Sequence, residues 1–177
     1  GATVLFAAAE RDAVNAVLAA FDGAGMKVEA VYHEPYALYH LSRITSESAS
    51  YIHVDLGRHA SIVNIVTGGV LVHSRVLNTG IHDALKPLLG RKDDPCAFEK
   101  VLYGFNPAKK ETASSAKIVR KLAIKPAQLQ KFSDSFTDHA AKTARQIAGV
   151  LKAFEKNGGA LAHDRILLSG NSGYTEY

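Results

Sequence analysis

The sequence contains one cysteine, Cys96, and no tryptophan among its 177 residues. A single thiol excludes an internal disulfide and a metal site built on cysteines, and it is typical of a protein from a reducing compartment. The sequence also lacks an apolar run long enough to span a membrane. Its first apolar stretch, Thr3 to Ala9, is followed at once by Glu10-Arg11-Asp12, which is not the pattern of a signal peptide.

A strong excess of one charge sign is also missing. The formal net charge is +4, with 21% charged and 47% hydrophobic residues, as in an ordinary globular protein. This charge permits anionic partners but does not demand nucleic acid, and no aromatic platform for stacking bases is visible, so we expect no nucleic-acid partner. The one basic concentration, Pro107 to Lys131, holds seven Lys or Arg against one Glu. It is either a solvated helix face or a patch for an anionic membrane surface or an acidic partner.

The most informative stretch is Asp55 to Gly80, which predicts three consecutive strands separated by glycine turns. Asp55 and Gly57 fall at the tip of the first hairpin, and Ser61 begins the return strand. Backbone N–H groups in a glycine turn suit phosphate, and a nearby carboxylate suits a phosphate-bound Mg²⁺ or an attacking water. The alternative is an ordinary hairpin turn without a ligand.

The rest of the chain predicts alternating strands and helices. Before the three strands we expect a β-α-β unit followed by a short helix, and a polar domain boundary at Thr45 to Ser50. After them we expect several helices and one last strand ending in a glycine loop. The expected elements are a strand at Thr3–Ala9, a helix from Glu10 to Gly23, a strand at Met26–Tyr32, helices at Tyr36–Leu41, Ile81–Leu89, Cys96–Tyr103 and Ala116–Ile124, a long helix from Pro126 to Asn157, and a strand at Ile166–Ser169.

Isolated candidate residues have simpler explanations. His53, His59 and His73 lie on or between neighbouring strands, but a metal site needs three or four converging ligands, so we expect satisfied histidines instead. Glu34 is expected to begin a helix rather than to act as a catalytic acid, and Cys96 is expected to be a small core residue.

The order of these motifs resembles the second half of the actin-like ATPase superfamily, and within it the PilM and FtsA family of type IV pilus assembly and cell division. In that superfamily Asp-x-Gly with a later Ser or Thr forms a phosphate loop, and a terminal strand with Gly-Gly forms an adenosine loop. The segments that carry the resemblance are Asp55-Leu56-Gly57 with Ser61, Gly69 to Arg75 followed by Thr79-Gly80, Ala24 to Val31, Glu34 to Leu38, and Gly170-Asn171.

The resemblance implies an α/β fold: an actin-like (ribonuclease H-like) second domain at 50–177 and a small β-α-β subdomain with a linker helix at 1–45. It implies ATP and Mg²⁺ as cofactors of the parent protein, with Asp55 positioning the metal. Gly57 and Ser61 would contact the β- and γ-phosphates. Thr79 and Gly80 would line the cleft, and Gly170 and Asn171 would lie near adenine. No catalytic residue is assigned.

The resemblance further implies a cytoplasmic scaffold, peripheral to the inner membrane, that holds the cytoplasmic tail of a PilN-like membrane partner. Because the first phosphate loop of the superfamily does not occur in this sequence, we expect the chain to be a fragment that neither binds ATP tightly nor hydrolyses it. Alternatives with the same fold are a scaffold like the L protein of type II secretion and an FtsA-like division scaffold. An alternative of another class is a sugar or acid kinase.

Overall fold

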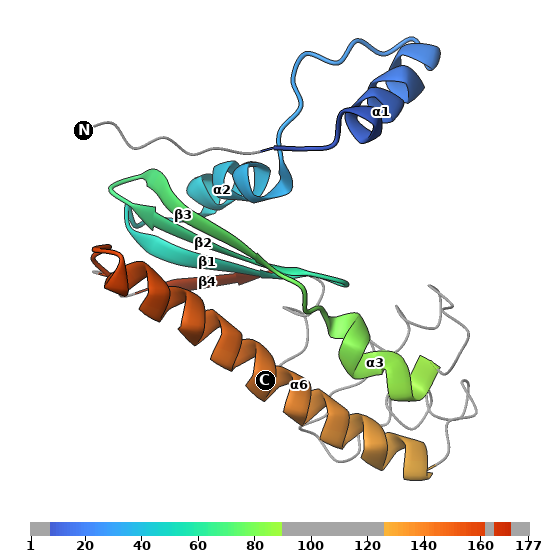
Figure 1. Cartoon of the computed structure of the whole chain (residues 1–177), viewed down its shortest axis with the longest axis vertical. Helices are drawn as coiled ribbons and strands as arrows, with labels where there is room; N and C mark the ends of the chain where they lie inside the picture. The colour runs from blue at the N-terminus through green and yellow to red at the C-terminus, as the bar shows by residue number, and fades with distance from the viewer. Residues whose placement is uncertain (1–7, 90–125, 162–164, 171–177) are drawn as a thin grey trace.

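The computed structural model describes residues 8–89, 126–161 and 165–170. A four-stranded sheet forms its centre, with helix α2 (Glu34–Thr45) on one face and helix α6 (Pro126–Lys156) on the other (Figure 1). Helix α3 (Ile81–Leu89) packs beside α6, beyond one end of the sheet. This arrangement is a three-layer unit, and it belongs to the α/β class that the sequence predicts.

The sheet combines two antiparallel hairpins with one parallel strand. Its order is β3-β2-β1-β4, where β1 (Tyr51–Leu56), β2 (Ser61–Thr67) and β3 (Val70–Leu77) are consecutive and antiparallel. The turn between β2 and β3 is made by Gly68 and Gly69 at φ 57° and 76°, which suits a tight hairpin between twisted strands. Strand β4 (Ile166–Ser169) pairs parallel to β1, so the chain crosses the sheet through α3 and α6 between them.

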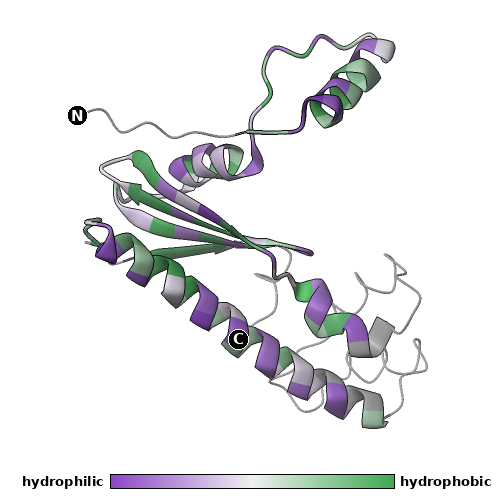
Figure 2. Cartoon of the chain, in the orientation of Figure 1, coloured by the Kyte–Doolittle hydropathy of each residue, from purple (hydrophilic) through white to green (hydrophobic). Residues whose placement is uncertain are grey.

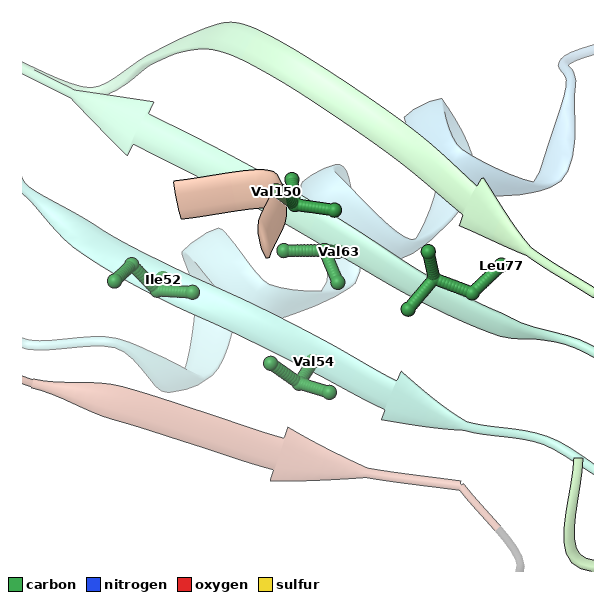
Figure 3. Close-up of a cluster of buried hydrophobic side chains, with 5 residues drawn as sticks. All are labelled: Ile52, Val54, Val63, Leu77 and Val150. Atoms are coloured by element: carbon green, nitrogen blue, oxygen red, sulfur yellow. The ribbon is translucent and has the colours of Figure 1, made fainter. Parts of the chain in front are cut away.

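The face of the sheet toward α6 carries the larger apolar core. Alternate residues of β1 and β2 point to this face and meet the helix, as expected for strands with a period of two. The buried members are Ile52, Val54, Val63, Leu77 and Val150 (Figure 3). Leu56, Ile147, Leu151 and Leu161 pack around them. On α6, polar residues alternate with apolar ones along the helix, which is typical of a helix with one buried face (Figure 2).

Helix α2 covers the opposite face through aromatic and polar contacts. The Tyr39 hydroxyl donates to the carbonyl of Gly69 at 2.7 Å, and Ser42 Oγ lies 3.0 Å from the Tyr51 hydroxyl. Tyr39, Tyr51, Val66 and Leu71 form a second buried cluster there. The helix begins at Glu34, with Pro in its first turn and the His33 side chain accepting from the amide of Tyr36. Because α2 shares a core with the sheet, it belongs structurally to the sheet unit.

The N-terminal part differs from the predicted β-α-β unit. Helix α1 (Arg11–Gly23) forms as expected, but it buries none of its residues and stands away from the sheet (Figure 1). Residues 26–32 form no strand, and Met26, Val31 and Tyr32 are more than half exposed. A β-rich run becomes a strand only where a neighbour pairs its backbone groups, and no strand of the described residues lies beside it. Most of its expected partner, Thr3–Ala9, falls outside those residues, as do the helices expected at 96–103 and 116–124.

Candidate functional site

The candidate site lies where the parallel strands β1 and β4 both end. Asp55 is the penultimate residue of β1 and is directly opposite Ser169, the last residue of β4. Carboxyl ends of parallel strands meet at one edge of a sheet, which is where open α/β sheets bind ligands. The chain continues into Gly57 after β1 and into Gly170 after β4. Asp55, Gly57 and Gly170 are therefore brought together at this edge.

A hydrogen-bond chain joins Asp55 to both strands. Ser169 Oγ donates to Asp55 Oδ1 at 2.6 Å, and His53 Nε2 lies 2.8 Å from the same Ser169 oxygen. The hydroxyl has a single hydrogen, which goes to the carboxylate, so its oxygen accepts from the Nε2–H of His53. The imidazole is therefore assigned as the Nε2-protonated tautomer. The order of donation is His53 to Ser169 to Asp55.

His53 is a buried member of this chain, with 4% of its surface exposed. Burial lowers the pKa of His53 below its ordinary value of 6.5, although the nearby Asp55 carboxylate acts in the opposite direction. A neutral imidazole matches the tautomer that the hydrogen bonds require. Its Nδ1 is buried and has no hydrogen-bond partner among the described residues.

The two glycine segments of the site pack against each other through their backbones. A Cβ atom at Gly57 would lie 2.5 Å from the carbonyl oxygen of Ala60, and one at Gly80 would lie 2.5 Å from the amide nitrogen of His59. The amide of Ile81 donates to the Gly57 carbonyl, and the amide of His82 donates to the Arg58 carbonyl. The first amides of α3 therefore fix the β1–β2 loop, and only glycine permits this approach.

Gly170 closes the other side of the site. Its φ of 98° is a conformation that side chains other than glycine rarely adopt, and a Cβ atom would lie 2.6 Å from the carbonyl carbon of Leu56. The end of β4 therefore lies directly against the end of β1. Asn171, the other residue predicted near adenine, lies outside the described residues.

The structure does not bring Ser61 to the same side as Asp55. In the β1–β2 register Asp55 is opposite Ile62 and Leu56 is opposite Ser61, and opposite residues share a face. Asp55 therefore faces α2, whereas Ser61 faces α6. Ser61 is buried, and its hydroxyl donates to the carbonyl of Thr79 at 2.8 Å. The predicted phosphate contact of this hydroxyl does not fit this geometry; the bond instead ties β2 to the segment before Gly80.

The histidines considered from the sequence lie apart. His53 faces α2, whereas His73 faces α6, where its ring centroid is 5.6 Å from that of Phe154. His59 lies in the β1–β2 loop and is near His82 instead, at 5.0 Å between ring centroids. Within residues 8–89, 126–161 and 165–170, no group of three or more His, Cys, Asp or Glu could hold a metal ion.

A magnesium ion that is held through phosphates requires fewer protein ligands than such a cluster provides. Mg²⁺ is commonly bound by one or two carboxylates together with substrate phosphates, and it keeps several waters. Asp55 offers one suitable atom, because Oδ1 is bonded to Ser169 while Oδ2 has no partner among the described residues. Oδ2 is directed toward the glycine turn, 3.7 Å from the place of a Gly57 Cβ. The donor set fits an outer-sphere or single-carboxylate site for a nucleotide-bound metal.

An apolar cavity, which the sequence analysis did not predict, lies between the sheet and α6. Its volume is about 280 Å³, and it lies on the Ser61 face of the sheet rather than on the Asp55 face. Its lining comes from β1, β2, β4, α3 and α6, and includes Leu56, Ser61, Ile81, Phe136, His139 and Leu168. Burial lowers the pKa of His139 below its ordinary value, and Asp83 partly offsets this effect.

Comparison with known proteins gives a structural likeness only. No protein-family model matches the chain, and no curated protein matches it. Among solved structures, a chain of the PilM–PilN type IV pilus biogenesis complex matches with a TM-score of 0.62 at 16% sequence identity, over 94% of this chain and 43% of that chain. Apo pSK41 ParM matches with a TM-score of 0.37 at 19% identity, over 70% of this chain and 30% of that chain.

The likeness to the PilM–PilN complex confirms the actin-like fold predicted from the sequence. The chain spans less than half of the length of that neighbour. None of the described helices combines the length and apolarity that crossing a bilayer requires. What this chain shares with its neighbour from the PilM–PilN complex is the actin-like fold.

Proposed function

We propose that this chain is part of an actin-fold scaffold of type IV pilus assembly whose parent protein binds ATP and Mg²⁺ at the Asp55 edge of the sheet. The observation that carries the proposal is the meeting of Asp55, Gly57 and Gly170 at the ends of β1 and β4. In an open α/β sheet this edge is the usual place for a ligand. ATP and Mg²⁺ come from the resemblance to the superfamily.

The residues of the proposed site have separate roles. Asp55 would position the metal through Oδ2. Gly57 and Gly80 allow the β1–β2 loop to pack against the start of α3, and the backbone of this turn would contact the phosphates. Ser61 and Thr79 support this backbone through their hydrogen bond. Gly170 and Asn171 remain the predicted adenine side. No side chain is assigned to catalysis, and the parent is proposed to be at most a weak ATPase.

The partner in this proposal is the cytoplasmic tail of an inner-membrane protein similar to PilN. It is supported by the likeness to a chain of the PilM–PilN complex over 94% of this chain. A cytoplasmic location under the inner membrane and contact with anionic lipid are parts of the same proposal. Scaffolds of type II secretion or of cell division would share the fold, and the genes next to this one would separate the three machines.

Titration calorimetry with Mg-ATP tests the nucleotide part of the proposal. The chain by itself is expected to bind ATP more weakly than micromolar. We propose that the chain is part of a longer protein, and this longer protein should bind ATP more tightly. Asp55→Asn in the longer protein should remove this difference, and Glu47→Gln, at a carboxylate whose side chain is 88% exposed, should not. Micromolar binding by the chain alone would contradict the proposal of a half-site.

Fluorescence anisotropy tests the partner. A labelled peptide with the cytoplasmic tail sequence of the PilN-like protein encoded nearby should bind the longer protein, and a scrambled peptide of the same composition should not. Equal binding of both peptides would overturn the partner assignment. Transfer of phosphate from ATP to a sugar or carboxylate substrate would instead favour the kinase alternative.

A further inference from the structure

We propose that Ser169 and His53 are positioning residues that hold the Asp55 carboxylate with Oδ1 occupied and Oδ2 presented to a divalent cation. This inference rests on the proposed function, because it names the residues that orient the proposed metal ligand. Neither residue carries the sequence resemblance, and both become visible only when β4 is placed beside β1.

The two oxygens of Asp55 have different surroundings. Oδ1 accepts from Ser169 Oγ at 2.6 Å, a short distance typical of a hydroxyl bonded to a carboxylate. Oδ2 is on the side of the Gly57 turn and has no partner in the described part of the chain. A carboxylate at the end of a strand otherwise rotates broadly about its last torsion. The Ser169 bond selects one of these orientations, so that the same oxygen always faces the turn.

His53 makes the Ser169 bond directional. A serine hydroxyl rotates to suit its neighbours, and it can donate or accept. Because the Nε2–H of His53 occupies an acceptor position of Ser169 Oγ at 2.8 Å, the serine hydrogen is left for Asp55. His53 lies on β1, between β2 and β4, and is buried, so solvent does not compete for its hydrogen bond to Ser169. Outer-shell hydrogen bonds of this kind are a general means of orienting metal ligands.

The test uses Mn²⁺ alone as the probe of the divalent site. In the ¹⁵N-labelled chain, paramagnetic broadening of the Gly57 amide reports occupancy near Asp55 even when binding is weak. We expect Ser169→Ala to weaken Mn²⁺ binding about tenfold, as typical for loss of an outer-shell partner. Ser169→Thr keeps the hydroxyl, so its Mn²⁺ affinity should stay close to that of the unmutated chain. Ser74→Ala is the matched control, because Ser74 lies on the same face and donates to Asn64 rather than to Asp55.

His53 is tested with two variants of similar size. His53→Gln keeps an N–H donor and should retain most of the Mn²⁺ affinity, whereas His53→Phe lacks the donor and should lose it about as Ser169→Ala does. The ¹⁵N shifts of the His53 ring provide a readout without metal: Nε2 should carry the proton in the parent chain and in Ser169→Thr. Amide spectra and melting temperatures show which variants remain folded. Ser169→Cys, a weak donor of nearly the same size, replaces Ser169→Ala if the latter unfolds.

The outcomes separate the two claims. Mn²⁺ affinity unchanged in Ser169→Ala or Ser169→Cys would overturn the positioning role alone, and so would a His53 ring protonated on Nδ1. If Mn²⁺ does not broaden the Gly57 amide in the unmutated chain, the metal site itself is overturned, and the positioning role is overturned with it. A tenfold loss restored by threonine and absent from Ser74→Ala supports both.

Discussion

Ser169 Oγ donates a 2.6 Å hydrogen bond to Asp55 Oδ1 across the parallel pair of β1 and β4. The two residues are 114 positions apart in the chain, so the bond exists only in the folded sheet. It links the two strand ends whose following glycines enclose the candidate site. Folding of the central sheet and construction of the site are therefore the same event.

The close approach of α3 to the β1–β2 loop should make Gly80 intolerant of a side chain. Gly80→Ala would place a Cβ atom against the Arg58 backbone, so we expect the free energy of unfolding to fall by about 2 kcal/mol or more. Gly149→Ala is the control, since nothing lies within 4 Å of its Cβ position in α6 and alanine favours a helix by about 0.5–1 kcal/mol. Urea unfolding measures both. Equal stability of the two variants would contradict the packing described for the loop.

The buried centre of β2 should dominate the stability of the sheet. Ile65 is fully buried, so Ile65→Ala should cost about 2–5 kcal/mol and Ile65→Val about 0.5–1.5 kcal/mol. Ile44, near the end of α2, is 82% exposed, and Ile44→Ala should change the free energy of unfolding by less than about 0.5 kcal/mol. Chemical denaturation of the three variants checks the order. A large loss at Ile44 would show that the exposed end of α2 is covered by something in solution.

Stability should decrease on mild acidification because of His73. Burial, and then the positive charge of Arg75, lowers the pKa of His73 below its ordinary value of 6.5. Below pH 6.5 the unfolded chain therefore binds more protons than the folded chain at this site, and the free energy of unfolding falls as the pH drops through the folded pKa. His53 and His139, whose pKa values are also lowered by burial, add to this effect.

The pH effect is measured by urea unfolding at about pH 7.5 and pH 5.5, on either side of the ordinary histidine pKa. His73→Gln removes the titrating group, so its loss of stability over this range should be smaller than that of the parent chain. A loss of the same size in both proteins would show that His73 does not cause it.

Most of the sheet unit could be predicted from the sequence because the residues that begin and end its elements act locally. Gly68-Gly69 defines the β2–β3 hairpin, Pro126 begins α6, and Gly158 follows the end of that helix, so the predicted bounds of α6 agree with the structure to within one residue. The helix predicted at Tyr36–Leu41 is longer in the structure, Glu34–Thr45, because no glycine marks its end. The strand predicted at Met26–Tyr32 was wrong for a complementary reason. Its β-rich composition is local, but a strand also needs a paired neighbour, and composition does not supply one.

The candidate site was predictable only in part. Asp55 and Gly57 are separated by one residue, so the sequence alone places a carboxylate beside a glycine turn, which either holds a ligand or is an ordinary hairpin turn. The opposite orientations of Asp55 and Ser61 depend on the register of β1 and β2, in which Leu56 pairs with Ser61. The contact between Asp55 and Ser169 depends on the register of two strands separated by α3 and α6, which no local signal determines.

The most direct test of the central claim maps Mn-ATP onto the ¹⁵N-labelled chain. If the Asp55 edge of the sheet is a nucleotide–metal site, the amides of Gly57, Gly80 and Gly170 should broaden first. Asp55→Asn should abolish this broadening, and Glu47→Gln should leave it unchanged. Two results would contradict the account. One is broadening of the Gly57 amide that is no stronger than that of the amide of Glu47, whose side chain is exposed. The other is broadening of the Gly57 amide that persists in Asp55→Asn.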